Sequence, residues 1–509
     1  MNNLTNLHTL AITKVKRMAM HPDPTRISRP ALFLVLFYLL ATSARAQEQA
    51  YFPDPNPAIQ QRIAEWQDLK FGVLFHWGPY SQWGIVESWS LCPEDLSWAT
   101  GARKAPFAGD YNEYRKTYEA LQYSFNPRQF NPTHWAEAAR KAGMRYVVIT
   151  TKHHDGFCMW DTKFTDYRIT DPKTPFSTDP RSNVIREVFD AFRKEGLWTG
   201  AYFSKPDWHS DYYWWKKFPP ADRNANYSIT KYPEQWAKFV EYTHNQIDEL
   251  MSDYGKVDIL WLDGGWVRKK TDAEIQQELL EKYEGSRWAR NAQSQDIDME
   301  GLVRKARAKQ PQLIVVDRAV PGPHQNYLTP EQHIPENGLP YPWETCMTMA
   351  TSWSHVPNDV YKSKAEILRK LVDIVSKGGN YLLNIGPRPD GELDPTAYQR
   401  LEEIGAWMDV HGKSIYNTRP YQVWHEGEQI RFTQSKDGKA VYVFFLETPA
   451  AADMVIESLS LRTGDTISML ENGQAIKWKA GENGILLRLP TSFMQSVHPV
   501  RVLEVKRAE

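Results

Sequence analysis

The sequence has little cysteine, and the cysteines it has are not arranged to cross-link the chain or to bind a metal. Its 509 residues include only Cys92, Cys158 and Cys346, which are widely spaced and form no C-x-x-C pair. An odd, scattered set of this kind argues against a disulfide scaffold and against a zinc ribbon. We therefore expect three buried, free thiols.

Several motifs that would assign other chemistry are also missing. The chain contains no G-x-S-x-G elbow of a serine hydrolase, no H-E-x-x-H helix and no glycine-rich loop for phosphate. Charge of one sign is not in excess, with 61 basic and 62 acidic side chains. This balance argues against a nucleic-acid partner, because binding nucleic acid requires a basic face.

Long hydrophobic runs are absent except near the N-terminus. There the apolar run Ala31–Ala41 follows two arginines and precedes the sequence A-R-A at 44–46. The run is too short for a comfortable membrane span, and the pattern is typical of a cleaved secretory signal. We predict a signal peptide over 1–46, with its hydrophobic region at about 31–42, and an exported protein, periplasmic or secreted, with no stable membrane span.

Short apolar runs that end in polar residues recur along the chain and are typical of buried parallel strands. They lie at 71–75, 146–150, 199–203, 259–262, 313–316 and 381–385. Helical stretches that stop at glycine lie between them, at 133–142, 184–195, 233–254 and 363–377. This alternation predicts an α/β fold, a (β/α) TIM-like barrel over 50–415, with a doubly wound open sheet as the alternative.

The pattern changes after about residue 415. Turn signals at 436–438, 471–473 and 482–484 separate short, strand-like runs. Asp-Gly and Asn-Gly pairs between such runs indicate β-hairpins. We predict a small antiparallel β-sandwich over 416–509.

One acidic residue is placed as a catalytic carboxylate would be. Asp263 directly follows the apolar run 259–262 and precedes two glycines. In a barrel this position falls at the C-terminal face, where active sites lie, although a turn or helix-capping aspartate remains an alternative. Glycoside hydrolysis requires a second carboxylate, and the pattern alone does not choose among Glu87, Glu331, Glu336 and Glu344.

Three histidines, His76, His153 and His154, follow predicted strands. They are candidates either for a metal site or for binding hydroxyl groups as neutral imidazoles. Adjacent residues of an extended chain point to opposite faces, and no helical H-x-x-x-H spacing occurs, so we expect hydroxyl binding and no metal or other cofactor.

Tryptophan is abundant, with 20 residues in the chain. Several tryptophans gather beside the same strand ends: Trp77, Trp83, Trp89, Trp160, Trp261, Trp266 and Trp343. Core packing explains most single tryptophans. Their concentration beside polar residues favours a carbohydrate-binding pocket, because an indole has a flat apolar face and a polar edge.

Four sequence blocks together resemble glycoside hydrolase family 29, the retaining α-L-fucosidases. They are F-H-W-G-P-Y-S at 75–81, T-K-H-H-D-G-F at 151–157, L-W-L-D-G at 260–264 and V-S-K-G-G-N-Y-L-L-N-I-G-P at 375–387. The resemblance covers roughly 50–415. It implies a barrel whose strand-end aspartate attacks the anomeric carbon, and a fucosylated oligosaccharide or glycoconjugate as substrate.

The resemblance also implies roles for individual residues. Asp263 takes the place of the nucleophile and Glu331 that of the acid/base, with Glu87 and Glu344 as alternatives for the second role. The substrate-binding residues it implies are His76, Glu87, Trp89, His153, His154, Tyr202, Trp261, Arg318 and Trp343. A related hydrolase for another sugar and a catalytically dead carbohydrate-binding barrel remain open alternatives, and the oligomeric state stays open.

Overall fold

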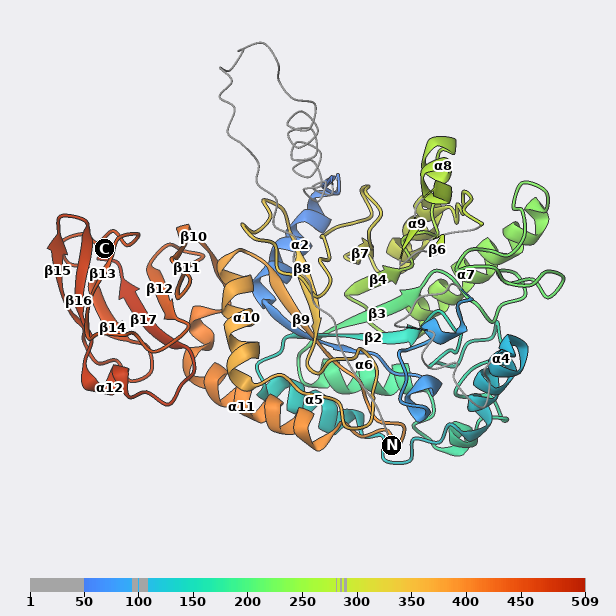
Figure 1. Ribbon diagram of the computed structural model, residues 1–509, viewed down its shortest axis with the longest axis horizontal. Helices are drawn as coiled ribbons and strands as arrows, with labels where there is room; N and C mark the ends of the chain where they lie inside the picture. Colours follow the sequence, from blue (N-terminus) through green and yellow to red (C-terminus); the bar gives the residue numbers. More distant parts are fainter. Residues whose placement is uncertain are drawn as a thin grey trace, which may run out of the picture. The chain divides into compact units, whose positions relative to one another are not determined.

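A curled sheet of seven parallel strands forms the centre of the fold (Figure 1). The order across the sheet is β7-β4-β3-β2-β1-β9-β8. The computed structural model describes residues 50–93, 99, 109–280, 282–283, 286–287 and 291–508. The strands are β1 Phe71–Phe75, β2 Tyr146–Lys152, β3 Trp198–Ser204, β4 Ile259–Asp263, β7 Ile314–Asp317, β8 Glu344–Thr348 and β9 Asn380–Ile385.

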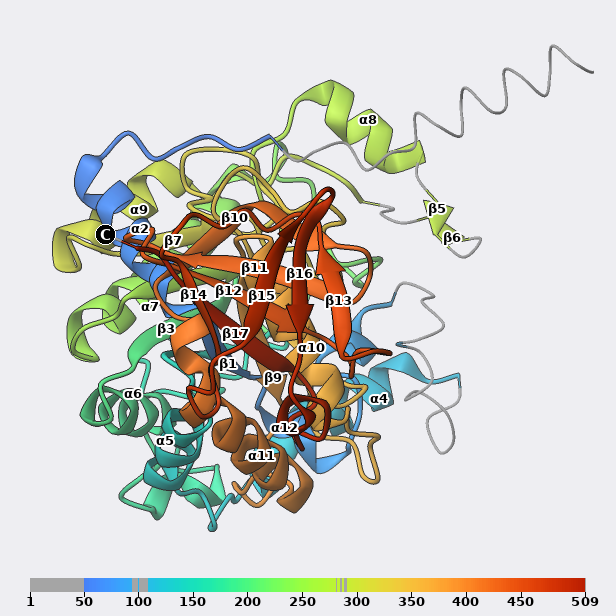
Figure 2. The same ribbon diagram turned by 90° about the vertical axis from the view of Figure 1, so that its left-hand side faces the viewer.

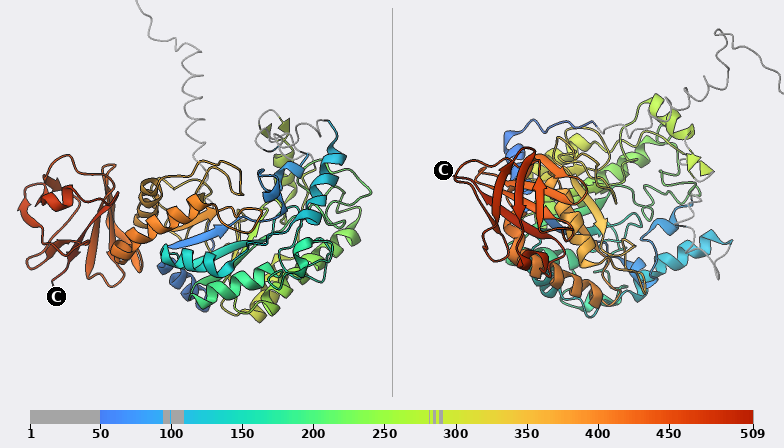
Figure 3. Two further views of the ribbon diagram at one scale, coloured as in Figure 1. Left: turned by 90° about the horizontal axis from the view of Figure 1, so that it is seen from below. Right: turned by 60° about the vertical axis from the view of Figure 1, so that its left-hand side comes forward.

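Helices connect the strands, and Figure 3 shows those coloured teal to green lying along the outer side of the sheet. α6 illustrates why they lie there: its valines, isoleucine and phenylalanines are buried, and it packs on β2 and β3. The helices are α2 Pro57–Leu69, α4 Tyr111–Glu119, α5 Pro132–Lys141, α6 Val184–Lys194, α7 Pro233–Asp253, α8 Asp272–Leu280, α9 Met299–Lys309, α10 Lys364–Ser376 and α11 Pro395–His411. Among the described residues, no helix is long and apolar enough to cross a membrane.

An irregular segment, 324–332, lies between the two edge strands β7 and β8. Its start pairs with β7, since Gln325 forms a bridge with Val316. Its end pairs with β8, since Glu331 forms a bridge with Cys346, and the Gln332 N–H donates to the Cys346 carbonyl at 2.9 Å. The segment therefore continues the barrel wall where the regular strands stop.

Bulky side chains fill the interior of the barrel. A buried cluster made mainly by strand residues includes Leu74, Tyr146, Trp261 and Tyr327. Trp66 of α2 enters the same cluster and stacks on Tyr327, with ring centroids 3.9 Å apart. As in barrels of this type, the interior is a packed core rather than a pore. A ligand site can therefore form only at an end of the barrel.

The C-terminal strands form two antiparallel sheets, shown in Figure 2. One has the order β10-β11-β12-β17-β14 and the other β13-β16-β15, with their own apolar core between them. The helix α11 is tied to this part by the Trp407 indole N–H, which donates to the Val500 carbonyl at 2.9 Å. The strands are β10 Thr418–Glu426, β11 Ile430–Ser435, β12 Ala440–Phe445, β13 Asp453–Ile456, β14 Thr466–Met469, β15 Lys477–Gly481, β16 Gly484–Arg488 and β17 Arg501–Lys506.

Short elements complete the fold. The remaining helix among the described residues is α12 Thr491–Met494, and β5 Lys282–Tyr283 and β6 Ser286–Arg287 form a two-stranded ribbon. The 3-10 turns are η1 Pro79–Gln82, η2 Trp89–Leu91, η4 Ala120–Ser124, η5 Pro175–Thr178 and η6 Gly412–Ser414.

The predicted fold class is confirmed: a TIM-like α/β barrel domain is followed by antiparallel β-sheets. The three cysteines are free and buried, as expected. The predicted signal peptide, 1–46, lies outside the described residues. One strand of the parallel sheet was not predicted: β8 has the sequence E-T-C-M-T, which is too polar to be recognised as an apolar run.

Candidate active site

A cavity of about 760 Å³ opens at the carboxyl ends of the parallel strands. Most of the residues singled out in the sequence line it: His76, Glu87, Trp89, His153, Tyr202, Trp261, Asp263, Arg318 and Glu331. His154 lies just behind this lining and contacts Asp263. Trp343 does not line the cavity. It is buried in the wall, where its ring packs against Gly379.

Strand register brings the central residues of this site together. Asp263 is the last residue of β4 and pairs with Ser204, while Trp261 pairs with Tyr202 two residues earlier. The chain then turns at Gly264, whose φ is +88°. A Cβ atom at Gly264 would lie 2.4 Å from Cδ of Pro206, so only glycine lets the chain leave the strand here.

Asp263 is held by two donors and is ionised. Its Oδ2 accepts the Tyr202 hydroxyl at 2.7 Å, and its Oδ1 accepts Nη1 of Arg318 at 3.1 Å. Burial alone would raise the pKa of Asp263, but the positive charge of Arg318, His154 nearby and the Tyr202 hydrogen bond outweigh burial and lower it far below the usual range. The carboxylate is therefore available as a nucleophile at any physiological pH.

One guanidinium joins two of the acidic residues that line the cavity, Asp263 and Glu331. While Nη1 of Arg318 contacts Asp263, its Nη2 donates to Oε2 of Glu331. The Glu331 side chain is 43% exposed, whereas that of Asp263 is only 17% exposed. The cavity thus presents an enclosed carboxylate and an open one on either side of a single cation.

The histidines are neutral. Burial lowers the pKa of both His76 and His154 to about 4, although neighbouring groups partly oppose it, and lowers the pKa of His153 well below its usual value. His76 Nδ1 lies 2.8 Å from Oδ1 of Asn384, and His153 Nδ1 lies 2.5 Å from Oγ of Ser88. Hydrogen bonds of this kind orient the rings and fix their tautomers.

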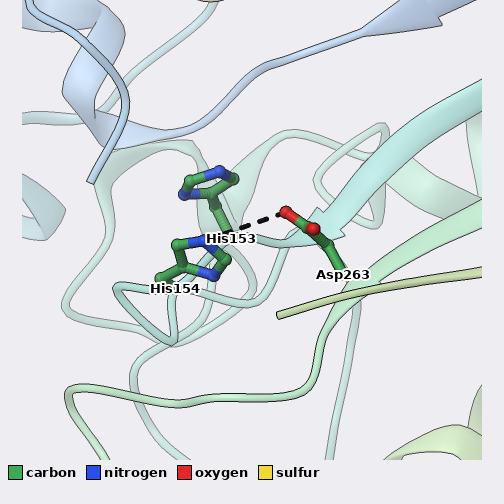
Figure 4. Close-up of side chains that lie close together, drawn as sticks. All are labelled: His153, His154 and Asp263. Atoms are coloured by element: carbon green, nitrogen blue, oxygen red, sulfur yellow. Dashed lines mark ion pairs between the residues drawn. The ribbon is translucent and has the colours of Figure 1, made fainter. Parts of the chain in front are cut away.

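Figure 4 shows His153, His154 and Asp263 lying close together. Their ligand atoms all lie within 4.8 Å of one another. Our expectation that the adjacent histidines diverge was wrong, because both follow the end of β2 at Lys152, where the extended conformation stops. The ring centroids of the two histidines are 4.3 Å apart.

A metal ion fits these three donors poorly on electrostatic grounds. Both oxygens of Asp263 already accept hydrogen bonds, from Tyr202 and Arg318. A divalent cation bound to Asp263 would lie beside the Arg318 guanidinium and be repelled by it. The neutral imidazoles are better suited to bind hydroxyl groups.

Two further acids lie near the site but are much less accessible. Glu87 lines the cavity, is 2% exposed and accepts the Ser354 N–H at 3.2 Å. Burial raises the pKa of Glu87 to about 8, so at neutral pH it is mostly a protonated donor. Glu344 is fully buried beneath the cavity, where it accepts the Tyr146 hydroxyl at 2.6 Å.

The structure adds cavity residues that the sequence did not reveal. Trp353 follows β8, and Arg223 comes from the long excursion after β3. The Arg223 guanidinium lies 5.0 Å from the ring of Trp89 and 5.2 Å from that of Trp266. The sequence of β8 is not recognisable as a strand, and Arg223 follows no motif. No local signal in the sequence therefore marks either residue.

Comparison with known proteins assigns the family. The family model described as α-L-fucosidase matches residues 38–413, and the model of the α-L-fucosidase C-terminal domain matches 425–506. The chain belongs to the α-L-fucosidase family. It is 28% identical to human tissue α-L-fucosidase over 92% of this chain and 94% of that protein.

Solved α-L-fucosidase structures share the fold. α-L-fucosidase isoenzyme 1 from Paenibacillus thiaminolyticus is 29% identical, with a TM-score of 0.69 over 89% of this chain and 100% of that one. The α-fucosidase from Thermotoga maritima in complex with fucose is 28% identical, with a TM-score of 0.67 and the same coverage of both chains.

Proposed function

We propose that the cavity binds the terminal α-L-fucosyl group of a fucosylated glycan, and that Asp263 and Glu331 release fucose by double displacement. The chain is an α-L-fucosidase by family, and the assignment of roles to these residues is our proposal. The observation that carries it is the contact of one guanidinium, that of Arg318, with both carboxylates inside one cavity.

The first step suits the enclosed carboxylate. An ionised Asp263 attacks the anomeric carbon, and the bond to the glycosidic oxygen breaks as a covalent fucosyl–enzyme ester forms. Glu331 gives its proton to the departing oxygen. Its exposed position is appropriate, because the leaving glycan must extend from that oxygen toward solvent.

The second step reverses these roles. Glu331, now a carboxylate, takes a proton from water, and the hydroxide oxygen attacks the anomeric carbon so that Asp263 departs. Two inversions retain the anomeric configuration. The proton taken from water restores Glu331 to its acid form for the next cycle, and the 43% exposure of its side chain gives that water access.

Neutral and aromatic groups bind the sugar in this proposal. The imidazoles of His76 and His153 offer hydrogen bonds to hydroxyl groups without adding charge. Trp261 offers an apolar surface to the C–H face and methyl group of fucose. Glu87, protonated near neutral pH, donates a hydrogen bond from the cavity wall.

Labelling tests the assignment. A 2-deoxy-2-fluoro-fucosyl fluoride forms the ester quickly and hydrolyses it slowly, so the modified peptide can be identified by mass spectrometry. We expect the label on Asp263. A label on another carboxylate would overturn the assignment, and hydrolysis of an aryl galactoside in preference to an aryl fucoside would favour an enzyme for a related sugar.

We also propose that the protein is exported after removal of residues 1–46, to the periplasm or the medium. The support is the charged, apolar and A-x-A pattern of the N-terminus. Sequencing of the mature protein from its native host should find a start at or near Gln47. An intact N-terminus in that host would overturn this proposal.

A further inference from the structure

Part of the cavity wall is made by residues that the proposed mechanism does not use. Trp266 and Arg268 follow β4, and Glu278 comes from α8. The side chains of Arg268 and Glu278 are 23% and 21% exposed, whereas Tyr202 is 1% exposed. This difference places Arg268 and Glu278 toward the mouth of the cavity.

The leaving group of the reaction must occupy the cavity mouth. The side chain of Glu331, the proposed proton donor to the glycosidic oxygen, is more exposed than that of Asp263. A cavity of about 760 Å³ is in the range that encloses drug-sized ligands and is larger than one monosaccharide requires. The first sugar of the leaving glycan therefore remains in contact with the wall.

The helix α8 lies at the periphery of the barrel domain, near the top of Figure 1. No side chain of α8 is buried, so the helix adds nothing to the hydrophobic core. Two ion pairs hold it to the preceding loop: Arg268 Nη1 to Glu274 Oε1 at 2.8 Å, and Lys270 Nζ to Glu278 Oε2 at 2.7 Å.

The ion pair between Lys270 and Glu278 has a free-energy cost, because it buries a cation. The Lys270 side chain is fully buried, and burial lowers the pKa of Lys270 even though Glu278 partly restores it. Burying a cation carries a desolvation penalty that an ion pair only partly offsets. What the pair achieves is a fixed position for the Glu278 carboxylate in the cavity wall.

We propose that Trp266, Arg268 and Glu278 form a subsite for the first sugar of the leaving group, and that this sugar is a neutral, hydroxyl-rich pyranose. This inference rests on the proposed function. The indole offers an apolar face, the guanidinium donates, and the carboxylate accepts from hydroxyl groups. Both charges are already paired, Arg268 with Glu274 and Glu278 with Lys270, so the subsite offers no net charge to an ionised sugar.

Two substrates isolate the subsite in the Glu278→Gln variant. Fluoride, the leaving group of α-L-fucosyl fluoride, is too small to touch the subsite, whereas a neutral α-L-fucosyl disaccharide fills it. We expect the KM for the disaccharide to rise about tenfold, which corresponds to a hydrogen bond to a charged group. The kcat/KM for fucosyl fluoride should stay within about twofold of wild type.

A matched control removes a charge from the same helix outside the cavity. Asp272 begins α8 and does not line the cavity, so Asp272→Asn should leave both substrates unchanged. An unchanged disaccharide KM in Glu278→Gln, or an equal loss on both substrates, would overturn the subsite. A wild-type enzyme that hydrolyses neither substrate would overturn the proposed function itself, and the subsite with it.

Discussion

The two carboxylates of the site are positioned by different kinds of structure. Asp263 ends a regular parallel strand, and β3 and β7 flank that strand. Glu331 lies on the irregular segment 324–332, which fills the wall between β7 and β8 with isolated bridges. The strand fixes its carboxylate in an enclosed place, and the segment presents its carboxylate to solvent.

This difference matches what each role demands. A nucleophile must be aligned with one carbon atom and must stay ionised, which suits an enclosed residue held by Tyr202 and Arg318. An acid/base must exchange protons with a leaving group and with water, which suits an accessible residue. The comparison predicts that substitutions in the two regions will have different kinetic signatures.

The largest expected effect is that of Asp263→Asn. An amide of the same shape cannot form the ester, so kcat/KM should fall by at least about 10⁴-fold on every substrate. The measurement is steady-state turnover of both an aryl fucoside and a fucosylated oligosaccharide. A variant with rates near those of wild type would contradict the assignment of the nucleophile.

Asp258 provides a matched control at the opposite end of the same strand. Its carboxylate is buried and accepts Nη2 of Arg62 at 2.6 Å and the Thr199 N–H at 2.9 Å. Asp258→Asn should therefore lower the free energy of unfolding by about 1–3 kcal/mol and leave kcat nearly unchanged. A thermal melt together with the same assay separates stability from chemistry.

Glu331→Ala should have an effect that depends on the leaving group. An oligosaccharide leaves as a poor alkoxide, so its cleavage should fall by about 100-fold or more, while an aryl fucoside should form the ester with only a modest loss. Azide should speed release of the ester, because it attacks without a base. Equal, weak losses on both substrates would move the acid/base role to Glu87 or Glu344.

Glu87→Gln should change how stability depends on pH. Burial raises the pKa of Glu87 to about 8, above the value near 4.3 expected in the unfolded chain. Between these values the folded state binds more protons, so the Glu87 contribution to stability is lost as pH rises through this window. The Tm of the variant relative to wild type should therefore increase from pH 5 to pH 8. A difference that stays constant with pH would show that Glu87 has an ordinary pKa in the folded protein.

The smallest expected effect is that of metal removal. His153, His154 and Asp263 converge, but two carboxylates suffice for this chemistry. Dialysis against EDTA should leave kcat/KM within about twofold of its starting value. A large loss that added zinc or calcium restores would identify the three residues as metal ligands.

The regular half of the barrel was predictable from sequence because one signal carries it. Apolar runs that end in polar residues predicted both ends of β1, β4 and β9 to within one residue. The same signal placed His76 and Asp263 at the cavity, since the residue that ends a parallel strand also lies at the site.

The irregular half was not predictable in the same way. β8 carries the buried polar residues Glu344 and Thr345, so its sequence does not read as a strand. Trp343 was expected in the pocket because of the family resemblance and its place among the strand-end tryptophans, yet its ring packs in the wall against Gly379. Arg223 reaches the cavity from a long excursion, and only tertiary structure brings it there.

The way in which the segment 324–332 is attached has a consequence for how this site can change over evolution. Its links to β8 include main-chain bonds, such as Glu344 N–H to the Leu328 carbonyl and Gln332 N–H to the Cys346 carbonyl, and such bonds constrain the path of the chain but not its side chains. Exposed positions on the segment, such as that of Glu331, can therefore be exchanged without loss of the barrel, whereas Tyr327 is fixed by its stacking on Trp66. Asp263 has no such freedom, because the register of β4 fixes its place in the cavity. We therefore expect the proposed nucleophile to keep a recognisable sequence context, while the position of the acid/base residue varies.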